Sequence, residues 1–564
     1  MDSFRSLVAL LARRAAEQAD DRAYVFVSDR GTEEAALTFR QLHNAASALA
    51  ARLGAAARPG ERAILVFPPG IEFMVAFFGC LMAGIIAVPM MMPRRNSARD
   101  ASAAILANCT PALALTSSAF ALRGDLQTRF TQDNIRWIEV DLAADAAAAV
   151  DLPEPTADDI AFLQYTSGST SEPKGVMVSH ANLLANLEMI RLALGNTRQS
   201  TYVNWVPLYH DMGLILNALQ AFYVGATCVL IAPNAFMQRP LGWLRAISHY
   251  RAEVACSPNF GFDLCVSRYR ADQMEGVDLS SLRIALNGAE PVHADTIERF
   301  VTAFSPHGFD PRAIYPAYGM AEATLLISGG RRGGGHVTRS VSRAALQAHG
   351  AEAPSGADDT QIVVGCGRAL AGERIAIVEP EQRTRLPADR VGEIWVNGAN
   401  VARAYWRNEG SRDGLNAEIF GEDGPWLRTG DLGFLDANGE LFVTGRIKDL
   451  IIIRGINHYP QDIERTVQSL DGALRENCGA AFSVPDEGEE TLVIVQEVER
   501  TARHTIDIAE IKGRIREAVA DSHELSARHI ALIRPGSLPK TTSGKIQRKL
   551  ARRLWLDGGL EEIG

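Results

Sequence analysis

The sequence predicts an α/β protein with a large first domain and a smaller α+β second domain. Apolar, β-branched runs alternate with amphipathic helical stretches over most of the 564 residues, a pattern typical of sheets covered by helices. Clear strand candidates are residues 62–67, 227–231 and 283–286. After Lys448 the pattern shortens to a strand candidate and a helix opened by Pro460. We therefore expect domains over 1–447 and 448–564.

Composition narrows the class of protein. The chain is 47% hydrophobic and 22% charged, which is ordinary for a globular protein, and it is long enough for more than one core. Its 57 basic and 67 acidic residues give a net charge of −10, which argues against nucleic acid or an anionic membrane as the main partner. The seven cysteines are scattered without a C-x-x-C pair, so we expect no disulfide framework, no zinc site and a cytoplasmic location.

One apolar segment needs a separate interpretation. Residues 73–88 are strongly apolar, but the run is too short to span a bilayer comfortably, contains Gly79 and Gly84, and ends at Pro89. We expect a buried helix and no stable membrane insertion. The short apolar run near the N-terminus is followed by Arg13 and Arg14, which does not fit a signal peptide.

The remaining elements follow from local signals along the chain. Ser179 is a good N-cap for a helix that carries Leu183 and Leu187 on one face. The glycine-rich stretch 329–335 predicts a weakly ordered loop, and 350–359 is small and polar. Residues 439–446 are typical of a hairpin with a strand over 440–444, and 449–455 predicts another strand.

The loop between the strand candidates 160–165 and 176–178 is rich in groups that bind phosphate. Glycine lets backbone N–H groups approach an anion closely, hydroxyl groups add donors, and a lysine adds positive charge. The residues concerned are Thr166, Ser167, Gly168, Ser169, Thr170 and Lys174. The loop is not a Walker A motif, because no G-x-x-x-x-G-K-[ST] is present and a strand follows it. The alternative is a polar hairpin turn.

Two further segments supply candidate nucleotide contacts. Asn287, Gly288, Ala289 and Glu290 follow a strand, and a Gly-Ala turn can line a flat heterocycle closely, although an ordinary strand-end turn has the same composition. In the second segment Tyr318, Gly319 and Met320 lead to Glu322 and Thr324. Tyr318 offers an aromatic face to adenine, Glu322 is a hard oxygen ligand suited to Mg²⁺, and Thr324 can donate a hydrogen bond near the α-phosphate or a substrate carboxylate. The alternative is a capped helix with Glu322 in solvent.

Together these segments resemble, in order along the chain, the motifs of the adenylate-forming superfamily, which includes acyl-CoA synthetases, luciferases and peptide-synthetase adenylation domains. The resemblance covers about residues 20–552. It implies ATP as a substrate, Mg²⁺ as a cofactor, a large N-terminal adenylate-forming domain built of several subdomains, and a small mobile α+β C-terminal lid domain.

The resemblance also assigns roles to four residues near the second domain. Thr429-Gly-Asp431 is similar to the family element whose aspartate holds the ribose hydroxyls, and Arg446 is similar to the arginine that reaches the ribose and phosphate. Lys448 falls at the family hinge about which the lid rotates between half-reactions. Lys545, in Pro539-Lys-Thr-Thr-Ser-Gly-Lys545, is similar to the catalytic lysine, which neutralises charge at the carboxylate and α-phosphate. As composition alone, this last segment is a basic surface loop.

Other segments resemble the fatty acyl-AMP ligase branch. They include residues 205–215, in which the resemblance implies a catalytic role for His210, and residues 257–265 and 450–464. The distance along the chain from Glu322 to Gly365 is longer than in CoA-using relatives, and the excess within 335–362 resembles the insertion that marks this branch. In that branch the insertion restricts lid movement and disfavours transfer to CoA. A plain surface insertion is the alternative.

The candidate substrate pocket is apolar. Its residues are Leu214, Ile215, Phe260 and Phe262. An apolar tunnel favours an alkyl chain, which gains about 0.8 kcal/mol per buried CH₂ group, although core packing produces the same composition.

The sequence therefore predicts an enzyme that uses ATP to convert a medium- or long-chain fatty acid into an acyl-adenylate and pyrophosphate. We expect the acyl group to pass to the phosphopantetheine of an acyl carrier protein, for lipid biosynthesis on a polyketide or peptide synthase. The alternatives are a long-chain fatty acyl-CoA synthetase and an inactive nucleotide-binding scaffold. Both a stand-alone enzyme and a loading module of a larger synthase fit the sequence.

Overall fold

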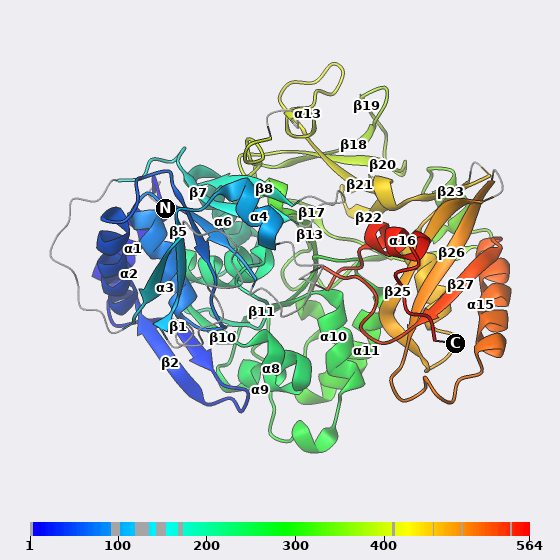
Figure 1. The fold of residues 1–564 in the computed structure, drawn as a ribbon, viewed down its shortest axis with the longest axis horizontal. Coiled ribbons are helices and arrows are strands. Elements are labelled where there is room, and N and C mark those ends of the chain that lie inside the picture. Colours follow the sequence, from blue (N-terminus) through cyan, green and yellow to red (C-terminus); the bar gives the residue numbers. More distant parts are fainter. Residues whose placement is uncertain are drawn as a thin grey trace.

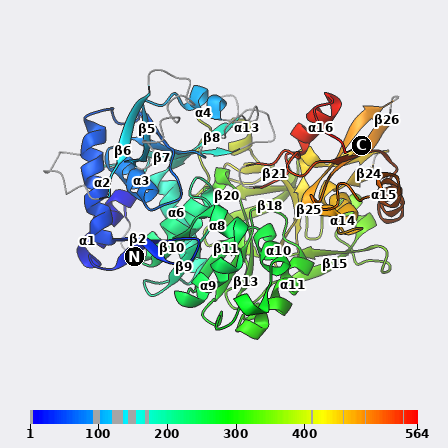
Figure 2. The ribbon, with the colours of Figure 1, turned by 60° about the horizontal axis from the view of Figure 1, so that its bottom comes forward.

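The computed structural model describes residues 4–91, 102–118, 135–142, 154–166, 173–408, 412–454, 456–486, 489–541 and 544–563. Its architecture is α/β, as predicted, with two large sheets, a smaller antiparallel sheet and a compact C-terminal region. In both views the C-terminal region, in orange and red, lies at the opposite end of the molecule from α1 and α2 (Figures 1 and 2).

The first large sheet carries the strands on both sides of the phosphate-type loop. Among the described residues its strand order is β6-β5-β3-β4-β7-β8, parallel except for the antiparallel pair β7–β8. The strands are β3 (Arg62–Leu65), β4 (Ile86–Pro89), β5 (Leu113–Ser117), β6 (Arg136–Val140), β7 (Ile160–Thr166) and β8 (Lys174–Ser179). The helices in this part of the chain are α1 (Leu7–Glu17), α2 (Phe39–Gly54), α3 (Glu72–Met82) and α4 (Ser102–Cys109).

The second large sheet positions the site. Its order in the described chain is β17-β14-β13-β12-β11-β9-β10-β1-β2, and the six strands from β13 to β1 run parallel. The strands are β1 (Arg22–Val27), β2 (Glu33–Thr38), β9 (Thr201–Asn204), β10 (Thr227–Ile231), β11 (Val254–Ser257), β12 (Ile284–Asn287), β13 (Ile314–Gly319), β14 (Leu326–Gly329) and β17 (Arg368–Ala369). Since ligands of such sheets bind outside the carboxyl ends of the strands, the segments that follow β9, β11, β12 and β13 are placed at one edge.

Helices of several kinds accompany this sheet. They are α6 (His180–Leu194), the π-helix η2 (Met212–Leu219), α7 (Gln220–Val224), α8 (Pro233–Gln238), α9 (Leu241–His249), α10 (Asn259–Ser267) and α11 (Ala294–Phe304). Short 3₁₀ turns are η3 (Ala271–Gln273), η4 (Ser305–His307), η5 (Pro311–Ala313) and η6 (Ala321–Ala323). One continuous apolar cluster joins residues of both large sheets and these helices, so they share a core.

The third sheet is antiparallel, in the order β19-β18-β20-β21-β22. Its elements are β18 (Arg374–Glu379), β19 (Thr384–Arg385), β20 (Gly392–Asn397), β21 (Leu427–Leu435) and β22 (Leu441–Arg446), with the short helix α13 (Arg412–Leu415) between β20 and β21. Before it comes a hairpin of β15 (Thr338–Ser342) and β16 (Thr360–Val364), joined through α12 (Arg343–Gln347).

The C-terminal region, called the lid below, has its own apolar cluster, whose buried members run from Ile451 to Leu532. It follows the 3₁₀ turn η8 (Ile447–Asp449). Its strands are β23 (Ile451–Ile453), β24 (Ile456–His458), β25 (Leu474–Asp486), β26 (Glu489–Val498) and β27 (Ala527–Ile533), and its helices are α14 (Pro460–Gln468), α15 (Ile508–His523) and α16 (Arg548–Leu556). The separate cluster supports our proposal that the boundary lies near Lys448.

Most of the predicted elements are confirmed. The strand predicted at 227–231 coincides with β10, and Pro460 opens α14 with Ile463 and Val467 buried. Ser179 caps α6 through a capping box with Asn182. The apolar run 73–88 forms the buried helix α3 and strand β4, and no helix within the described ranges is long and apolar enough to cross a membrane. All seven cysteines are free and buried.

One predicted strand has different bounds, and one predicted loop has an anchor that was not expected. Residues 330–335 form a loop, and Arg332 within it donates hydrogen bonds of 2.7 Å to the carbonyls of Leu194 and Gly195 and pairs with Glu253. The strand predicted over 449–455 begins only at Ile451, because η8 occupies Ile447–Asp449.

Candidate active site

Asp431, Arg446 and Tyr318 form a compact polar group. Asp431 lies within β21 and is paired across the sheet with Arg446 of β22. Arg446 Nε contacts Asp431 Oδ1 at 2.8 Å, and the Tyr318 hydroxyl donates to Oδ2 at 2.8 Å. Asp431 is buried, so its negative charge raises the pKa of Arg446. A buried carboxylate held between two donors is a rigid acceptor for further hydroxyl groups.

Glu322 is held by a residue that the sequence analysis did not single out. The Tyr405 hydroxyl donates to Glu322 Oε1 at 2.8 Å. Lys174 lies over the face of the same tyrosine ring, with its Nζ 5.0 Å from the ring centroid. Tyr405 therefore links the lysine at the end of the phosphate-type loop to the candidate metal ligand. Burial raises the pKa of Glu322 and thus disfavours its carboxylate form. A cation bound at this position would act in the opposite direction and favour the carboxylate.

Thr324 differs from the expectation. Its backbone has φ +64° and ψ −58°, and the N–H of Leu325 donates to the carbonyl of Ala323 at 2.7 Å, which describes a γ-turn. The side chain is fully buried and its hydroxyl donates to the carbonyl of Asn400 at 2.6 Å. In this conformation the hydroxyl proton is engaged with the backbone and is not available to a phosphate or a substrate carboxylate. The residue instead holds the tight turn that follows Glu322.

The segment 287–290 lies beside β13, as an adenine pocket would require. A side chain at Gly288 would stand 2.8 Å from the carbonyl oxygen of Ala317, so only glycine fits this approach. Ala289 has φ +66°, and Asn287 is buried and donates to Asn259 Oδ1 at 3.1 Å. Gly319 is the last residue of β13 and Met320 follows it, so both lie at the carboxyl edge of the same sheet.

The contacts of Glu290 indicate a role beyond nucleotide binding. Its Oε1 accepts a hydrogen bond of 2.6 Å from the backbone N–H of Phe260. Burial raises its pKa to about 7, while the positive charge of Lys545 acts in the opposite direction. This carboxyl group therefore belongs to the surroundings of the candidate catalytic lysine.

Lys545 is brought from the lid to the carboxyl edge of the second large sheet. Burial lowers its pKa, and Arg446 acts in the same direction, while Asp211, Asp431 and Glu290 oppose them. Its loop is closed by a hydrogen bond of 2.7 Å from the N–H of Thr541 to its carbonyl. A side chain at Gly544 would be 3.6 Å from the Phe260 ring, so the loop contacts α10 directly.

His210 and Asp211 lie at the N-terminal end of the π-helix η2, on the segment after β9. His210 Nδ1 is 2.7 Å from Asp211 Oδ1. Burial raises the pKa of Asp211, but His210, Lys545 and the backbone N–H of Met212 outweigh it and leave that pKa below its usual value. Asp211, which lies in the segment 205–215 but received no role from the sequence, is thus a carboxylate whose charge acts on Lys545.

The candidate substrate residues divide into two groups. Leu214 and Ile215 are fully buried in η2, and π-helical turns are frequent at functional sites. Phe260 is partly exposed, next to Gly544 and edge-on to Trp205 at 5.7 Å. Phe262 instead packs edge-on between Trp243 and Phe300, at 6.0 and 4.9 Å, so it is a core residue of the α9–α11 layer.

The predicted phosphate-loop residues fall only partly within the described residues. Ser167, Gly168, Ser169 and Thr170 lie outside the described residues, whereas Thr166 ends β7 and Lys174 begins β8. Lys448 lies in η8, directly after the strand that carries Arg446. Among the described side chains there is no cluster of three or more potential metal-ligating residues.

The hairpin β15–β16 and its helix α12, which coincide with the predicted insertion, contact the lid directly. Gln361 donates to Asp462 at 3.0 Å, Asn457 donates to the carbonyl of Gln347 at 3.2 Å, and Arg343 donates to the carbonyl of Ser522. Leu346 and Tyr459 belong to one apolar cluster. The segment predicted to be an insertion therefore forms part of the interface between the lid and the rest of the chain.

Comparisons with known proteins identify relatives over almost the whole chain. The family model described as AMP-binding enzyme matches residues 11–406, and the model described as Disco-interacting protein 2-like, AMP domain, matches residues 448–564. The medium-chain-fatty-acid–[acyl-carrier-protein] ligase JamA of Moorena producens is 42% identical over 99% of this chain and 96% of its own length. The long-chain-fatty-acid–AMP ligase FadD32 of Mycolicibacterium smegmatis is 37% identical over 98% and 95%. The crystal structure of the fatty acid AMP ligase from Legionella pneumophila aligns with a TM-score of 0.77 at 39% identity, covering 100% of this chain and 98% of that one.

Proposed function

Because the chain belongs to the AMP-binding enzyme family, and within it to the fatty acyl-AMP ligase branch, we propose that it activates a medium- or long-chain fatty acid with ATP and passes the acyl group to an acyl carrier protein. The first half-reaction joins the fatty-acid carboxylate to the α-phosphate of ATP and releases pyrophosphate. In the second, the phosphopantetheine thiol of the carrier displaces AMP. The observation that carries this proposal is that the loop of Lys545 passes Phe260, whose backbone N–H donates to Glu290, so that the charges of Asp211, Glu290, Asp431 and Arg446 act on the lysine.

The chain's own residues account for the first half-reaction as follows. Asp431, fixed by Tyr318 and Arg446, accepts hydrogen bonds from the ribose hydroxyls. The turn 287–290 and Tyr318 line the adenine, and Lys174 with Thr166 and the rest of its loop holds the phosphates. Lys545 neutralises the negative charge that the carboxylate and the α-phosphate bring together. Such electrostatic stabilisation is the main demand of phosphoryl displacement.

Glu322 fits the requirements of a magnesium ligand. Mg²⁺ in nucleotide sites is commonly held by one or two carboxylates together with substrate phosphates, so the partly buried Glu322 carboxylate, linked through Tyr405 to Lys174, is a suitable donor. The Tyr405 hydroxyl fixes one of its oxygens. When bound, the ion supplies charge neutralisation to the phosphates. His210 is retained as a catalytic candidate because it adjoins Asp211 and so the surroundings of Lys545.

The remaining parts of the proposal concern substrate and location. Leu214, Ile215 and Phe260 are candidates for contact with the alkyl chain, while Phe262 supports them from the core. Seven free, buried cysteines fit a reducing cytoplasm. The lid begins near Lys448, which serves as the hinge in this proposal.

The test is mass spectrometry of the products formed from the protein, ATP, Mg²⁺ and a series of fatty acids of increasing length. Each reaction is divided into samples without acceptor, with free CoA, and with phosphopantetheinylated carrier protein. We expect acyl-AMP that persists with CoA and loads the carrier. Efficient acyl-CoA formation would instead assign the chain as an acyl-CoA synthetase, and no adenylate with any chain length would overturn fatty-acid activation.

A further inference from the structure

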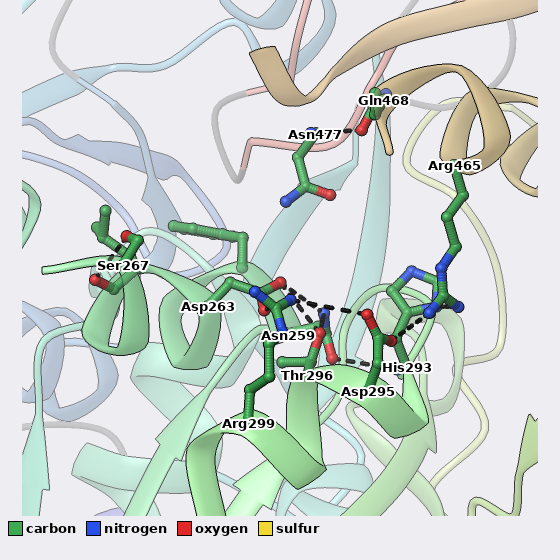
Figure 3. A network of polar contacts seen from close by, with 12 residues as sticks. Asn259, Asp263, Ser267, His293, Asp295, Thr296, Arg299, Arg465, Gln468 and Asn477 are labelled. Carbon is green, nitrogen blue, oxygen red and sulfur yellow. Dashed lines mark hydrogen bonds and ion pairs between the residues drawn. The ribbon is translucent and has the colours of Figure 1, made fainter. Parts of the chain in front are cut away.

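Lys545 can act only while the lid is closed on the core, so contacts that hold this closed position take part in the reaction. One such contact joins α14 of the lid to α11 of the core and includes none of the proposed nucleotide-binding side chains. Arg465 of α14 forms an ion pair with Asp295 in the first turn of α11 (Figure 3). Arg465 also lies 3.5 Å from His293 Nδ1, at the N-cap of the same helix.

The core side of this contact is braced. Arg299, one helical turn after Asp295, lies 3.7 Å from it and 2.7 Å from Asp263 of α10. Asp263 also accepts a hydrogen bond of 3.1 Å from Thr296, and Asn259 donates to Asp263 and Thr296 (Figure 3). Asp295 therefore sits on a helix that is fixed to α10, and α10 carries Phe260, which contacts the loop of Lys545.

The lid side leads to the catalytic loop. Glu464, the residue before Arg465, binds Arg548 with both carboxylate oxygens at 2.7 Å. Arg548 opens α16, three residues after Lys545, and also lies 3.2 Å from Asp449 beside the hinge. Glu464 is buried, and its Oε1 accepts a further hydrogen bond from the N–H of Ala481 at 2.9 Å. Two neighbouring residues of α14 thus have different partners: Arg465 binds the core, and Glu464 binds Arg548 next to the Lys545 loop.

We propose that Arg465 and Asp295 are positioning residues for the adenylation half-reaction, and that α14 relays their contact through Glu464 and Arg548 to the loop of Lys545. This inference rests on the proposed function. It assigns the pair to the closed lid position alone, because a rotation about Lys448 that withdraws Lys545 also carries α14 away from α11. The pair is about half exposed, with side-chain exposures of 47% and 46%, so its effect on the rate is modest.

The charges around Arg465 favour this assignment. Asp295 faces it from α11, and Asp462 lies on its own helix. His293 is neutral, because burial and the charge of Arg465 lower its pKa to about 4. Reversal of the charge at Arg465 would place two carboxylates together across the interface and repel the lid.

The experiment compares Arg465→Ala, Arg465→Glu and the exchanged pair Arg465→Glu with Asp295→Arg. Acyl-AMP formation is measured by pyrophosphate exchange, and transfer is measured separately from supplied acyl-AMP to a phosphopantetheinylated carrier. We expect adenylation kcat to fall by about 2- to 5-fold in Arg465→Ala and further in Arg465→Glu, with unchanged KM for ATP and unchanged transfer. The exchanged pair recovers most of the loss.

Arg198→Ala is the matched control. It removes an exposed ion pair of 2.7 Å with Asp21 that lies wholly within the first domain, and its adenylation stays at the wild-type rate. Wild-type adenylation by Arg465→Glu, equal loss in both half-reactions, or failure of the exchanged pair to recover would overturn the proposal.

A readout independent of activity separates this inference from the proposed function. Hydrogen exchange of Ala294–Phe304 and Pro460–Gln468 reports closure directly. We expect faster exchange in both segments of Arg465→Glu and recovery in the exchanged pair, even if no fatty acid is activated. Unchanged exchange would overturn the role of the Arg465–Asp295 contact in closing the lid. Absence of adenylate from the wild-type protein would overturn only the proposed fatty-acid activation.

Discussion

At the scale of single residues, Lys545 carries the largest part of the proposed chemistry. Its neighbours have opposite effects on its pKa: Arg446 lowers the pKa, whereas Asp211, Asp431 and Glu290 raise it. Burial and the charge of Arg446 lower the pKa of Lys545, while the three carboxylates favour its ammonium form, so the charge needed for adenylation is lost as pH rises.

Replacement of Lys545 by alanine should therefore abolish acyl-AMP formation while ATP binding persists. Loss of a charge that neutralises the developing transition state costs about 100- to 1000-fold in rate. Calorimetry of ATP binding and mass spectrometry of acyl-AMP measure the two effects separately. Unchanged adenylation in this variant would remove Lys545 from its role.

The pH dependence of adenylation provides a second test of the same residue. Because the pKa of Lys545 lies below its usual value, kcat/KM should fall as pH rises through that lowered pKa. Lys545→Arg keeps the charge and should move this fall to higher pH, even if its maximal rate is reduced. A fall at the same pH in both proteins would assign the titration to another group.

Tyr405 is the residue-scale contact that the sequence did not reveal. Tyr405→Phe removes the hydrogen bond to Glu322 but keeps the ring beneath Lys174. A hydrogen bond to a charged group contributes about 1.5–3 kcal/mol, so we expect roughly a tenfold or greater loss in adenylation and a higher Mg²⁺ concentration for half-maximal rate. The control is Tyr269→Phe, at an exposed tyrosine near α10 and α11. Equal magnesium dependence in the two variants would contradict the role of Tyr405.

The positions of Glu322, Asp431, Arg446 and Lys545 could be predicted from sequence because each lies in a motif of several residues. Tyr405 could not, because its partners lie far away along the chain and one aromatic residue in a loop carries no local pattern. Thr324 was given a donor role from its place after Glu322, but the backbone turn commits its hydroxyl to Asn400. Its direction is set by a γ-turn, which residue type alone does not indicate.

At the scale of elements, the packing of α1 against α6 depends on a neutral histidine. His180, in the first turn of α6, is buried, and its Nδ1 accepts a hydrogen bond of 3.4 Å from the N–H of Leu7. Burial lowers the pKa of His180 to about 4. Since the unfolded chain binds this proton first, near pH 6.5, stability is complete above about pH 6.5 and is lost as pH falls toward 4.

We expect His180→Gln to flatten this dependence. Between pH 7.5 and 5 the wild-type protein should lose about 2 kcal/mol more unfolding free energy than the variant, a difference measured from denaturant midpoints by circular dichroism. His504→Gln, at an exposed histidine, is the control and should follow the wild type. Parallel curves for His180→Gln and wild type would mean that the histidine is not kept neutral by burial.

Element types were predicted well where the pattern was long, and less well where tertiary contacts decide. The capping box of α6 and the proline that opens α14 are local signals and were recognised. The π-helical form of η2 has no local signal, since its run of apolar residues suits any buried helix. The attachment of the loop 330–335 to the end of α6 through Arg332 depends on residues distant along the chain, which glycine content cannot indicate.

At the scale of the whole molecule, the position of the lid relative to the core decides which half-reaction can proceed. Two separate sets of contacts hold the position seen here. One is the α11–α14 contact, and the other joins the hairpin β15–β16 and α12 to the lid through Gln361, Asn457 and Arg343. The fatty acyl-AMP ligase branch is expected to disfavour CoA because its insertion limits lid rotation, and these contacts are where such a limit would act.

Loosening the insertion should therefore widen acceptor use. A variant with Arg343→Ala, Gln361→Ala and Asn457→Ala loses polar contacts to the lid but none of the proposed nucleotide residues. With free CoA we expect acyl-CoA formation to rise several-fold relative to wild type. The population of a minor state follows its free-energy gap, so a less restrained lid reaches the transfer position more often. Acyl-AMP formation should change less than acyl-CoA formation. Arg385→Ala, which removes a bidentate pair between β19 and Glu422 in the segment before β21, is the control for surface ion pairs in general. Acyl-CoA at the wild-type level in the triple variant, with carrier loading intact, would mean that the acceptor is chosen by the surface that receives the carrier and not by restraint of the lid.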